Sequence, residues 1–505
     1  VLLFAPTSFY ISRNEGGPWD VIYAGAVTLA LAALVLFAFR RVLVSSVLVN
    51  AAVAIVVTVA AAKQRAMDTS LHAYDVVFYL GSWSTIAYLW FAARAYVVLF
   101  ALSWVLIIAL AWLAWRLDGT RIARLNAIIA FACCVTAAGA TGLTKPDRRQ
   151  TQFYWNALYV SSFYASWAET LETLWRGQLI ESATAASPHA PPFAAAGTCN
   201  PKQKPPHIIL IHEESIVQPN LFPGLAYDRG VDPFFQSGDG RIHKLGVETY
   251  GGASWLTEFS VLTGLSTHSF GGMRPFVQML MRGKIRDTLT EALGRCGYRN
   301  VIFYPMLRNF VSNDRFYQSI GLKEIFDLKD QGATSVQERD RFYFANALKE
   351  MERHFAKSQQ PMFTYIQTMS AHWPYDYKYE PDADVPGGAP GTHPEMHEYL
   401  RRVSLAKRDF DEFMGELRKR FPRERFLVVH YGDHHPTATR TYLGFGEDVE
   451  AEDVALSPES TGFITYYAAR GVNYRVPALP PFETLDVPYL GTAILDMAGL
   501  PLPAS

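Results

Sequence analysis

The sequence predicts a bundle of membrane-spanning α-helices followed by an α/β domain with a mainly parallel sheet. Three observations support this fold class. Four long stretches in the first third of the chain carry no charged residue, and short apolar runs alternate with amphipathic stretches after residue 206. Only 18% of the 505 residues are charged, whereas soluble proteins carry about 25%. These changes divide the chain into a transmembrane domain at 1–145, an interfacial helix and linker at 146–206, and the α/β domain at 207–505.

The composition excludes several classes of protein. A net charge of −1 offers no basic surface, so we expect no nucleic-acid partner. An aromatic content of 14% is too high for a disordered chain. Four Cys in the whole sequence exclude a disulfide-rich scaffold and a Cys-rich zinc array. A metal site in this protein would therefore use other ligands.

The four uncharged stretches are each about 19 to 21 residues long, enough to cross a hydrocarbon core of about 30 Å as a helix. They are Val21–Phe39, Val42–Ala62, Ala95–Trp115 and Leu125–Thr144. The alternative is a buried core helix, but such helices rarely stay free of charge over this length four times in one chain. We therefore predict four transmembrane helices.

Basic loops give the orientation of these helices. Arg40 and Arg41 separate the first two spans, and Arg116, Arg121 and Arg124 separate the last two. Because short cytoplasmic loops are enriched in Lys and Arg, both loops should face the cytoplasm and the α/β domain should lie outside it. The residues before the first span would then also lie outside. We therefore expect a further helix upstream and five spans in the intact protein.

Two aromatic segments are expected at the membrane surface. Val76–Ala93 is uncharged but too close to the next span to be a separate crossing, so we expect a helix at the headgroup level, with a re-entrant segment as the alternative. Gln150–Trp175 is amphipathic and predicts an outer-surface helix. Ser182–Pro206 is rich in Ala and Pro and predicts a linker. Cys199 and Cys296 could pair in an oxidising compartment, which sequence alone does not decide.

The second part of the chain alternates two kinds of pattern, which argues for a parallel sheet covered on both faces. Short apolar runs predict strands at Ile208–Ile211, Asn300–Tyr304, Met362–Thr368, Arg425–Tyr431 and Gly462–Ala468. Amphipathic stretches predict helices at Trp255–Leu262, Ile285–Gly294, Asp340–Lys357, Glu395–Phe421 and Val487–Met497.

Polar residues gather where these strands are expected to end. The sequence His212-Glu213-Glu214-Ser215 follows the first strand, Gly432-Asp433-His434-His435 follows a later one, and His372 follows another. Each motif alone is more often a solvated loop or a helix cap. Because ligands bind at the carboxyl ends of strands in such sheets, their coincidence at one edge favours a functional site. Carboxylate and imidazole ligands suit Zn²⁺ or Mn²⁺.

Ser254 is the hydroxyl that we expect at this site. It follows a Gly251-Gly252-Ala253 turn and opens a predicted helix, whose free N–H groups would attract an anion. A metal beside its oxygen would favour the alkoxide and make it a nucleophile. The alternative is a simple helix cap, and the rival hydroxyls are Thr249, Thr257 and Ser260.

The order of these motifs resembles the sulfatase/alkaline-phosphatase superfamily. The resemblance rests on Glu214-Ser215, on Ser254 with Thr257-Glu258-Phe259, on Met369-Ser370-Ala371-His372-Trp373-Pro374 and on Gly432-Asp433-His434. Within the superfamily, the chain is most similar to the membrane-anchored phosphotransferases: lipoteichoic acid synthase, the phosphoglycerol transferases of periplasmic glucans and the phosphoethanolamine transferases. The resemblance implies that residues 207–505 form a sulfatase-like catalytic domain, a three-layer sandwich behind about five spans.

The resemblance also implies roles for particular residues. Glu214, Ser254, Asp433 and His434 correspond to the ligands of one divalent metal, Zn²⁺ or Mn²⁺, with Glu213 as the rival to Glu214. Ser254 stands at the position of the nucleophile, and His372 matches a His near the transferred phosphate. A second metal, with His212 or His435 as a ligand, is left open.

The sequence departs from the family in the expected substrate pocket. Tyr304 replaces a His, and Phe310–Asn313 lacks the Trp and Arg of the matching stretch in lipoteichoic acid synthase. Arg308 or Arg315 would have to supply the missing positive charge. We assign Tyr304, Arg308, Asn313, Arg315, Trp373 and His435 as candidate substrate-binding residues. True sulfatases are disfavoured, because Ser254–Glu258 lacks the Pro and Arg of their Cys/Ser-x-Pro-x-Arg motif.

The resemblance implies transfer of a phospholipid head-group phosphate through a phospho-Ser intermediate to a glycan or lipid acceptor. Phosphoglycerol is the favoured group and phosphoethanolamine the second. The implied location is a bacterial-type inner (cytoplasmic) membrane, with the catalytic domain in the periplasm or outside the cell. One alternative is a metal-dependent phosphodiesterase, a hydrolase that uses water as acceptor. Another is a non-catalytic protein that binds a glycan and regulates envelope assembly.

Overall fold

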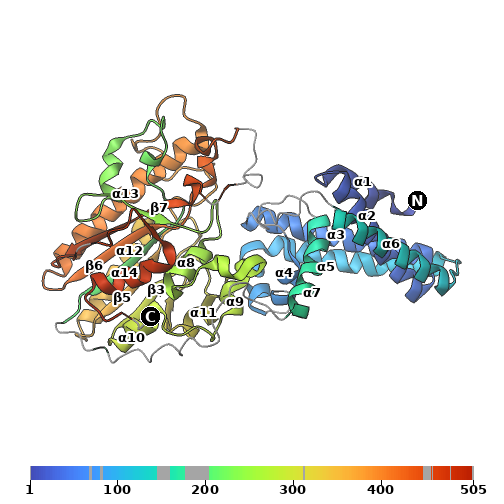
Figure 1. Ribbon diagram of the computed structural model, residues 1–505, viewed down its shortest axis with the longest axis horizontal. Helices are drawn as coiled ribbons and strands as arrows, with labels where there is room; N and C mark the ends of the chain where they lie inside the picture. The colour runs from blue at the N-terminus through green and yellow to red at the C-terminus, as the bar shows by residue number, and fades with distance from the viewer. Residues whose placement is uncertain are drawn as a thin grey trace. The chain divides into compact units, whose positions relative to one another are not determined.

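The structure is a computed structural model. It describes residues 2–67, 71–79, 83–144, 160–176, 199, 204–310, 313–446, 456–457, 459–477 and 479–502. The chain forms two compact units, one made of the helices up to Arg176 and one made of the α/β domain. Figure 1 shows both units.

The first unit is entirely helical in its described residues. Its helices are α1 (Ala5–Asn14), α2 (Pro18–Phe39), α3 (Val42–Met67), α4 (Ala73–Phe78), α5 (Trp83–Leu117), α6 (Arg124–Thr144) and α7 (Ser161–Arg176), after a 3₁₀ turn η1 (Leu2–Phe4). Four helices, α2, α3, α5 and α6, contain stretches long and apolar enough to cross a membrane. The prediction of four spans is confirmed on the criteria of length and composition.

The two basic loops lie at the same end of these helices. The Arg41 guanidinium lies over the Trp115 ring, 4.1 Å from its centre, and donates a hydrogen bond of 2.8 Å to the carbonyl oxygen of Asp118. The Asp118 carboxylate accepts from the Leu43 backbone N–H at 2.7 Å. Both loops therefore lie at one end of the four apolar helices, the arrangement that a shared cytoplasmic side for both loops would require.

One expectation about the surface segments is wrong. We expected Val76–Ala93 to be a helix apart from the next span, but α5 continues from Trp83 through Arg94 to Leu117. Arg is a good helix former, so a charged residue at this position does not end the helix. The resulting helix of 35 residues is about 52 Å long at 1.5 Å per residue, longer than the hydrocarbon core.

Helix α7 is the described part of the expected surface helix Gln150–Trp175, and residues 150–159 lie outside the described residues. It packs against the other helices of its unit through Phe163 and Tyr164. The Tyr164 hydroxyl lies 3.3 Å from the hydroxyl of Thr28 on α2. Through these contacts α7 is part of this helical unit, while Leu171 and Trp175 further along the helix are exposed.

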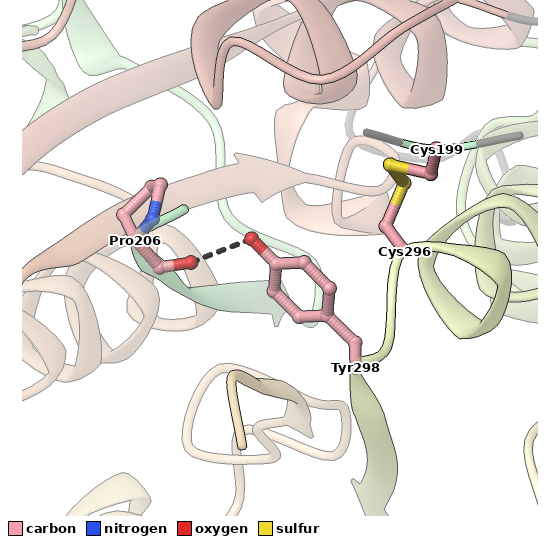
Figure 2. Close-up of a disulfide and its surroundings, with 4 residues drawn as sticks. All are labelled: Cys199, Pro206, Cys296 and Tyr298. Atoms are coloured by element: carbon pink, nitrogen blue, oxygen red, sulfur yellow. Dashed lines mark hydrogen bonds between the residues drawn. A yellow bond between two sulfur atoms is a disulfide. The ribbon is translucent and has the colours of Figure 1, made fainter. Parts of the chain in front are cut away.

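A disulfide joins Cys199 to Cys296, with the two Cα atoms 5.0 Å apart (Figure 2). The pairing that the sequence left undecided is therefore present. Most of the expected linker Ser182–Pro206 lies outside the described residues. Near the disulfide, the Tyr298 hydroxyl donates to the Pro206 carbonyl oxygen at 2.6 Å. These two contacts fasten the chain to the α/β domain just before its first strand.

The α/β domain contains an eight-stranded sheet with the order β4-β3-β5-β1-β6-β7-β2-β8. Its strands are β1 (His207–Glu213), β2 (His243–Gly246), β3 (Arg299–Phe303), β4 (Glu324–Phe326), β5 (Met362–Gln367), β6 (Phe426–Gly432), β7 (Ile464–Val472) and β8 (Thr484–Asp486). Only β7 runs antiparallel to its neighbours, β6 and β2. The prediction of a mainly parallel sheet is confirmed. All seven residues of β1 are buried, as expected for a central strand with both faces covered.

Helices cover both faces of the sheet (Figure 1). They are α8 (Ser254–Thr263), α9 (Val277–Leu280), α10 (Leu289–Arg295), α11 (Asn313–Ser319), α12 (Asp340–Phe355), α13 (Pro394–Arg420) and α14 (Leu490–Met497). Apolar residues of α12 and α13 pack on one face in a core that includes Ile209 and Val428. The helices α8, α10 and α14 pack together on the other. This arrangement is the predicted three-layer sandwich.

Candidate active site

The site lies at the carboxyl ends of β1 and β6, which are neighbouring parallel strands. Glu213 at the end of β1 is in register with Gly432 at the end of β6. The next residues, Glu214 and Asp433, therefore leave the sheet side by side. This is the sheet edge at which the sequence predicts a functional site.

Left-handed backbone conformations adjoin two of the predicted ligands. Ser215, which follows Glu214, has φ 58°, and Ala253, which precedes Ser254, has φ 63°. Residues other than Gly rarely adopt this region, and such residues cluster at functional sites. The turn at Ala253 makes Ser254 the first residue of α8. Its hydroxyl is thereby placed at the helix N-terminus.

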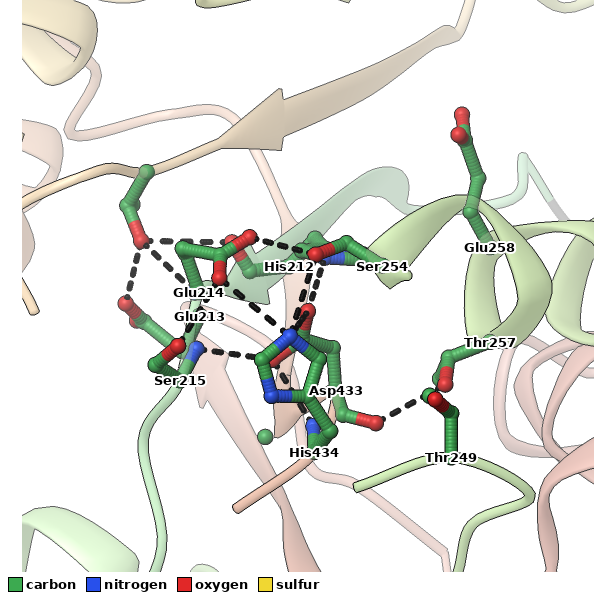
Figure 3. Close-up of polar contacts among 12 residues, drawn as sticks. His212, Glu213, Glu214, Ser215, Thr249, Ser254, Thr257, Glu258, Asp433 and His434 are labelled. Carbon is green, nitrogen blue, oxygen red and sulfur yellow. Dashed lines mark hydrogen bonds and ion pairs between the residues drawn. The ribbon is translucent and has the colours of Figure 1, made fainter. Parts of the chain in front are cut away.

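Ser254 contacts Glu214 and His434, two of the residues that we predicted at the same site (Figure 3). Its Oγ donates a hydrogen bond of 2.7 Å to Glu214 Oε2 and lies 3.2 Å from His434 Nε2. His434 Nε2 in turn lies 3.3 Å from Glu214 Oε1 and 3.3 Å from Asp433 Oδ2. The structure thus brings Glu214, Ser254, Asp433 and His434 into one cluster, in which all but the half-buried Ser254 are buried.

His212 is a further member of this cluster. Its Nε2 lies 3.1 Å from Asp433 Oδ2, and its Nδ1 lies 2.8 Å from the Tyr431 hydroxyl. His212, Glu214 and Asp433 each offer a ligand atom, and these atoms lie within 4.8 Å of one another. The alternation of side chains along a strand explains why His212 and Glu214 share a side.

The same alternation turns Glu213 away from Ser254. Glu213 Oε2 accepts a hydrogen bond of 3.0 Å from the Thr368 hydroxyl, and Oε1 lies 3.8 Å from His430 Nδ1. Thr368 Oγ1 also accepts from the Glu214 backbone N–H at 3.3 Å. Sequence reasoning did not single out Thr368, although its place at the end of a predicted strand was a usable signal.

The donor set fits a divalent cation. Two carboxylates, imidazole nitrogen and a hydroxyl are ligands that Zn²⁺ and Mn²⁺ accept. His434 Nδ1 donates to the carbonyl oxygen of His435 at 2.9 Å, so its Nε2 is the nitrogen directed at the carboxylates. Asp433 Oδ1 accepts from the backbone N–H groups of Ser215 and His434, both at 2.8 Å, which leaves Oδ2 on the side of the imidazoles.

The electrostatics of the cluster also indicate a need for positive charge. Burial alone would lower the pKa of His434, but the Asp433 and Glu214 carboxylates together outweigh burial and raise this pKa to about 9. Burial would raise the pKa of Glu214, but the hydrogen bond with His434 and its charge hold this pKa below the ordinary value. In the absence of a cation, a proton on His434 thus balances the carboxylates.

His372 and Trp373 lie on the segment that follows β5, and both side chains are exposed. His372 Nδ1 donates to the carbonyl oxygen of Trp373. The Trp373 side chain is 50% exposed, which is unusual for a residue of this size. Both residues are available to a substrate.

The other predicted substrate-binding residues fall into two groups. Buried Tyr304 and Asn313 contact each other, since Asn313 Nδ2 donates to the Tyr304 hydroxyl at 2.8 Å. Arg315 is exposed on α11. Arg308, in contrast, is paired with Asp330 and with Asp327, whose Oδ2 lies 3.1 Å from Arg308 Nε. The charge of Arg308 is therefore shared with two carboxylates.

His435 is directed away from the Ser254 cluster. Its Nε2 donates to the carbonyl oxygen of Ile464 at 2.7 Å, and its Nδ1 lies 3.4 Å from the Thr439 hydroxyl. Burial lowers the pKa of His435 to about 4, so the ring is neutral at neutral pH. Both ring nitrogens thus have protein partners.

Residues 247–456 match the family model named Sulfatase, so the α/β domain contains a sulfatase-family domain. The chain is 22% identical over 325 residues to an uncharacterized protein of Haemophilus influenzae, covering 60% of this chain and 55% of that protein. It is 22% identical over 144 residues to the lipoteichoic acid synthase of Staphylococcus saprophyticus, covering 28% and 21% of the two chains. The chain thus spans about half or less of the length of these relatives.

A solved structure of similar fold covers nearly the whole chain. It is the integral membrane protein lipooligosaccharide phosphoethanolamine transferase A from Neisseria meningitidis. The TM-score is 0.54 at 13% identity, with 99% of this chain and 95% of that chain covered. This likeness concerns the fold alone, and it agrees with the predicted combination of apolar N-terminal helices with an α/β domain.

Proposed function

We propose that the protein is a membrane-anchored, metal-dependent phosphotransferase. It transfers the head-group phosphate of a phospholipid, phosphoglycerol or phosphoethanolamine, to a glycan or lipid acceptor. The observation that carries this proposal is the hydrogen bond of 2.7 Å from Ser254 Oγ to Glu214, within a buried cluster of carboxylates and imidazoles. A hydroxyl held at a helix N-terminus beside such a cluster is suited to attack phosphorus.

Glu214, Ser254, Asp433 and His434 are the proposed ligands of the metal, and His212 supports Asp433. When bound, a divalent cation supplies positive charge that favours the alkoxide of Ser254 and offsets the charge of the phosphate oxygens. We infer that the first metal is Zn²⁺ or Mn²⁺, since both accept this mixture of oxygen and nitrogen ligands.

In the first half of the proposed reaction, Ser254 Oγ forms a bond to the phosphorus of the lipid. The bond between phosphorus and the diacylglycerol oxygen breaks, and the substituted phosphate stays on Ser254. Glu214 accepts the hydrogen bond of the Ser254 hydroxyl and so orients Oγ, and the proton of the hydroxyl passes to solvent. His372, exposed on the segment after β5, is the proposed donor of a proton to the leaving diacylglycerol.

In the second half, the acceptor hydroxyl attacks the same phosphorus. The bond between Ser254 Oγ and phosphorus breaks, and Ser254 regains a proton. His372 is the proposed acceptor of the proton from the attacking hydroxyl, the reverse of its first role. If water enters instead, the same site acts as a phosphodiesterase.

We favour phosphoglycerol as the transferred group, on the resemblance of Ser254–Phe259 to that branch of the superfamily. Phosphoethanolamine is the second choice. The relatives named above include both a lipoteichoic acid synthase and, by fold, a phosphoethanolamine transferase.

We infer that the α/β domain lies outside the cytoplasm, in the periplasm or at the cell surface. The basic loops at one end of the helices support this orientation. The disulfide between Cys199 and Cys296 supports it independently, since structural disulfides persist in oxidising compartments.

The test follows both products of the reaction. Purified, metal-loaded protein is incubated with phosphatidylglycerol or with phosphatidylethanolamine, with and without envelope glycan. Release of diacylglycerol from one lipid is expected, and Ser254→Ala should abolish it, while Ser260→Ala in the same helix should not. Head-group phosphate found on the glycan supports a transferase, whereas free head-group phosphate alone supports the hydrolase. Release of neither product from either lipid would overturn the proposal.

A further inference from the structure

Arg402 on α13 is a fully buried cation that contacts the backbone next to the candidate site. Its guanidinium donates to three carbonyl oxygens: those of His372 at 2.7 Å, Pro374 at 2.8 Å and Tyr377 at 2.9 Å. Its Nε lies 3.2 Å from the Glu398 carboxylate one turn earlier on the same helix. The five N–H groups of Arg, in a planar fork, are suited to such a set of acceptors.

Aromatic rings surround the same guanidinium. Its central carbon lies 5.0 Å, 4.3 Å and 5.4 Å from the ring centres of Tyr375, Tyr377 and Tyr379. These residues alternate along the segment 371–380, which we call the strap. A cation over aromatic faces is stabilised most when it is desolvated, as Arg402 is. The strap is thus wrapped around one side chain.

The far end of the strap is also fixed. The Glu380 carboxylate pairs with Arg339 and Arg408, and Arg401 donates to the Glu380 carbonyl oxygen. At the near end, the backbone N–H of Ser370 donates to Asp340 at 3.0 Å. The backbone of the strap is therefore held at both ends and in the middle.

Against this fixed backbone, the side chains of His372 and Trp373 remain exposed. His372 is the proposed proton donor. The hydrogen bond from Arg402 to the carbonyl oxygen of His372 links α13 directly to this residue. An exposed Trp beside a catalytic imidazole offers a flat surface to a substrate. The charge of Arg402 itself is buried beneath the strap and does not reach solvent.

We propose that Arg402 is a positioning residue for head-group transfer, acting through the strap to hold His372 and Trp373 in the productive place. This inference rests on the proposed function. A catalytic group displaced by about 1 Å can lose about 100-fold in rate. Lys keeps the charge at this position but lacks the planar fork, so Arg402→Lys should leave carbonyl acceptors of the strap unpaired.

A double-mutant cycle tests the proposal. Diacylglycerol release is measured for the wild type, Arg402→Lys, His372→Ala and the double variant, all loaded with the same metal. Arg402→Lys should lower kcat about 10- to 100-fold in the wild type but less than about 2-fold in the His372→Ala background, because the two residues act as one unit. An equal loss in both backgrounds, or no loss in either, would overturn the proposal.

Amide hydrogen exchange gives a readout that does not depend on activity. In Arg402→Lys, residues 371–380 should exchange faster while β1, β6 and α8 keep their protection and the bound metal. Arg408→Lys is the matched control, because Arg408 also contacts the strap but is half exposed and keeps its pairing with Glu380 as Lys. Unchanged exchange in the strap of Arg402→Lys contradicts the proposal.

A replacement variant and the activity of the wild type distinguish a folding defect, a failure of the proposed function and a failure of the role proposed for Arg402. If Arg402→Lys does not fold, Tyr377→Leu replaces it, since this change removes the ring nearest to the guanidinium from a half-buried position. The same cycle and the same exchange experiment are then expected to give the same results. If the wild type releases no diacylglycerol, the proposed function fails. If the wild type is active and the cycle shows no coupling, only the role of Arg402 fails.

Discussion

The charge balance of the buried cluster predicts that metal binding competes with protons. Burial lowers the pKa of His434, but the Asp433 and Glu214 carboxylates together outweigh burial and raise this pKa to about 9 in the metal-free protein, against an ordinary value of 6.5. A ligand must be deprotonated to bind a metal. Below pH 9 each binding event therefore displaces the proton of His434. The apparent affinity for Zn²⁺ or Mn²⁺ should rise about tenfold per pH unit well below pH 9, and about 50-fold in all from pH 7 to pH 9, where half of His434 is already deprotonated.

The same rise in the pKa of His434 also affects the stability of the metal-free protein. This stability should fall as the pH rises, whereas the affinity for the metal increases. Because the pKa of His434 in the folded state lies above that in the unfolded state, its contribution is fully present below about pH 6.5 and is lost as the pH rises through 9. The difference of about 2.5 pKa units corresponds to about 3 kcal/mol. Metal-free protein should therefore melt at a lower temperature at pH 9 than at pH 6, and bound metal should reduce this loss.

The assay is competition with a chelator of known affinity at pH 7, 8 and 9, with thermal unfolding measured on the same samples. His434→Gln is the control, since Gln does not titrate and should flatten most of the pH dependence. An affinity that stays constant from pH 7 to pH 9 in the wild type would refute the reasoning. It would mean that the carboxylates do not hold a proton on His434.

Three further predictions concern the ligands, the disulfide and a buried carboxyl. Glu214→Gln should lower metal content, whereas His435→Asn should leave it unchanged by elemental analysis; equal losses would contradict the ligand assignment. Cys199→Ser should destabilise the α/β domain by up to about 4 to 5 kcal/mol in chemical unfolding, because the disulfide closes a loop across a separation of 97 residues. An unchanged midpoint of chemical unfolding would contradict a stabilising role for this disulfide. Burial, together with the charge of Asp409, raises the pKa of Asp340 to about 7. The folded state should therefore lose stability as the pH rises from about 4 to about 7. Asp340→Asn should flatten this dependence, which unfolding experiments across that pH range would measure.

Long buried elements could be predicted from the sequence because their own residues determine them. The strand β1 has an uninterrupted apolar run from Ile208 to Ile211, and it lies in the centre of the sheet. The short strands β2, β4 and β8 have three or four residues each, too few to show a pattern. They form because neighbouring strands offer them hydrogen bonds, which a single sequence does not display.

In the candidate site, too, some features could be predicted from the sequence and others could not. The position of polar residues after strands predicts that Glu214, Ser254 and Asp433 converge, since the topology brings strand ends to one edge. The pairing of Arg308 with Asp327 and the contact of Arg402 with the strap depend on tertiary packing. Arg402 lies within a long amphipathic helix, where sequence alone predicts a solvated surface residue.

The central claim is that Ser254 carries the head-group phosphate during the reaction. Mass spectrometry of peptides from the metal-loaded protein, after incubation with phosphatidylglycerol or phosphatidylethanolamine, tests this claim most directly. The account predicts a phosphoglycerol or phosphoethanolamine adduct on the peptide that contains Ser254, and no adduct in Ser254→Ala. An adduct on another residue, or an unmodified Ser254 in samples quenched while diacylglycerol is being released, would contradict the account.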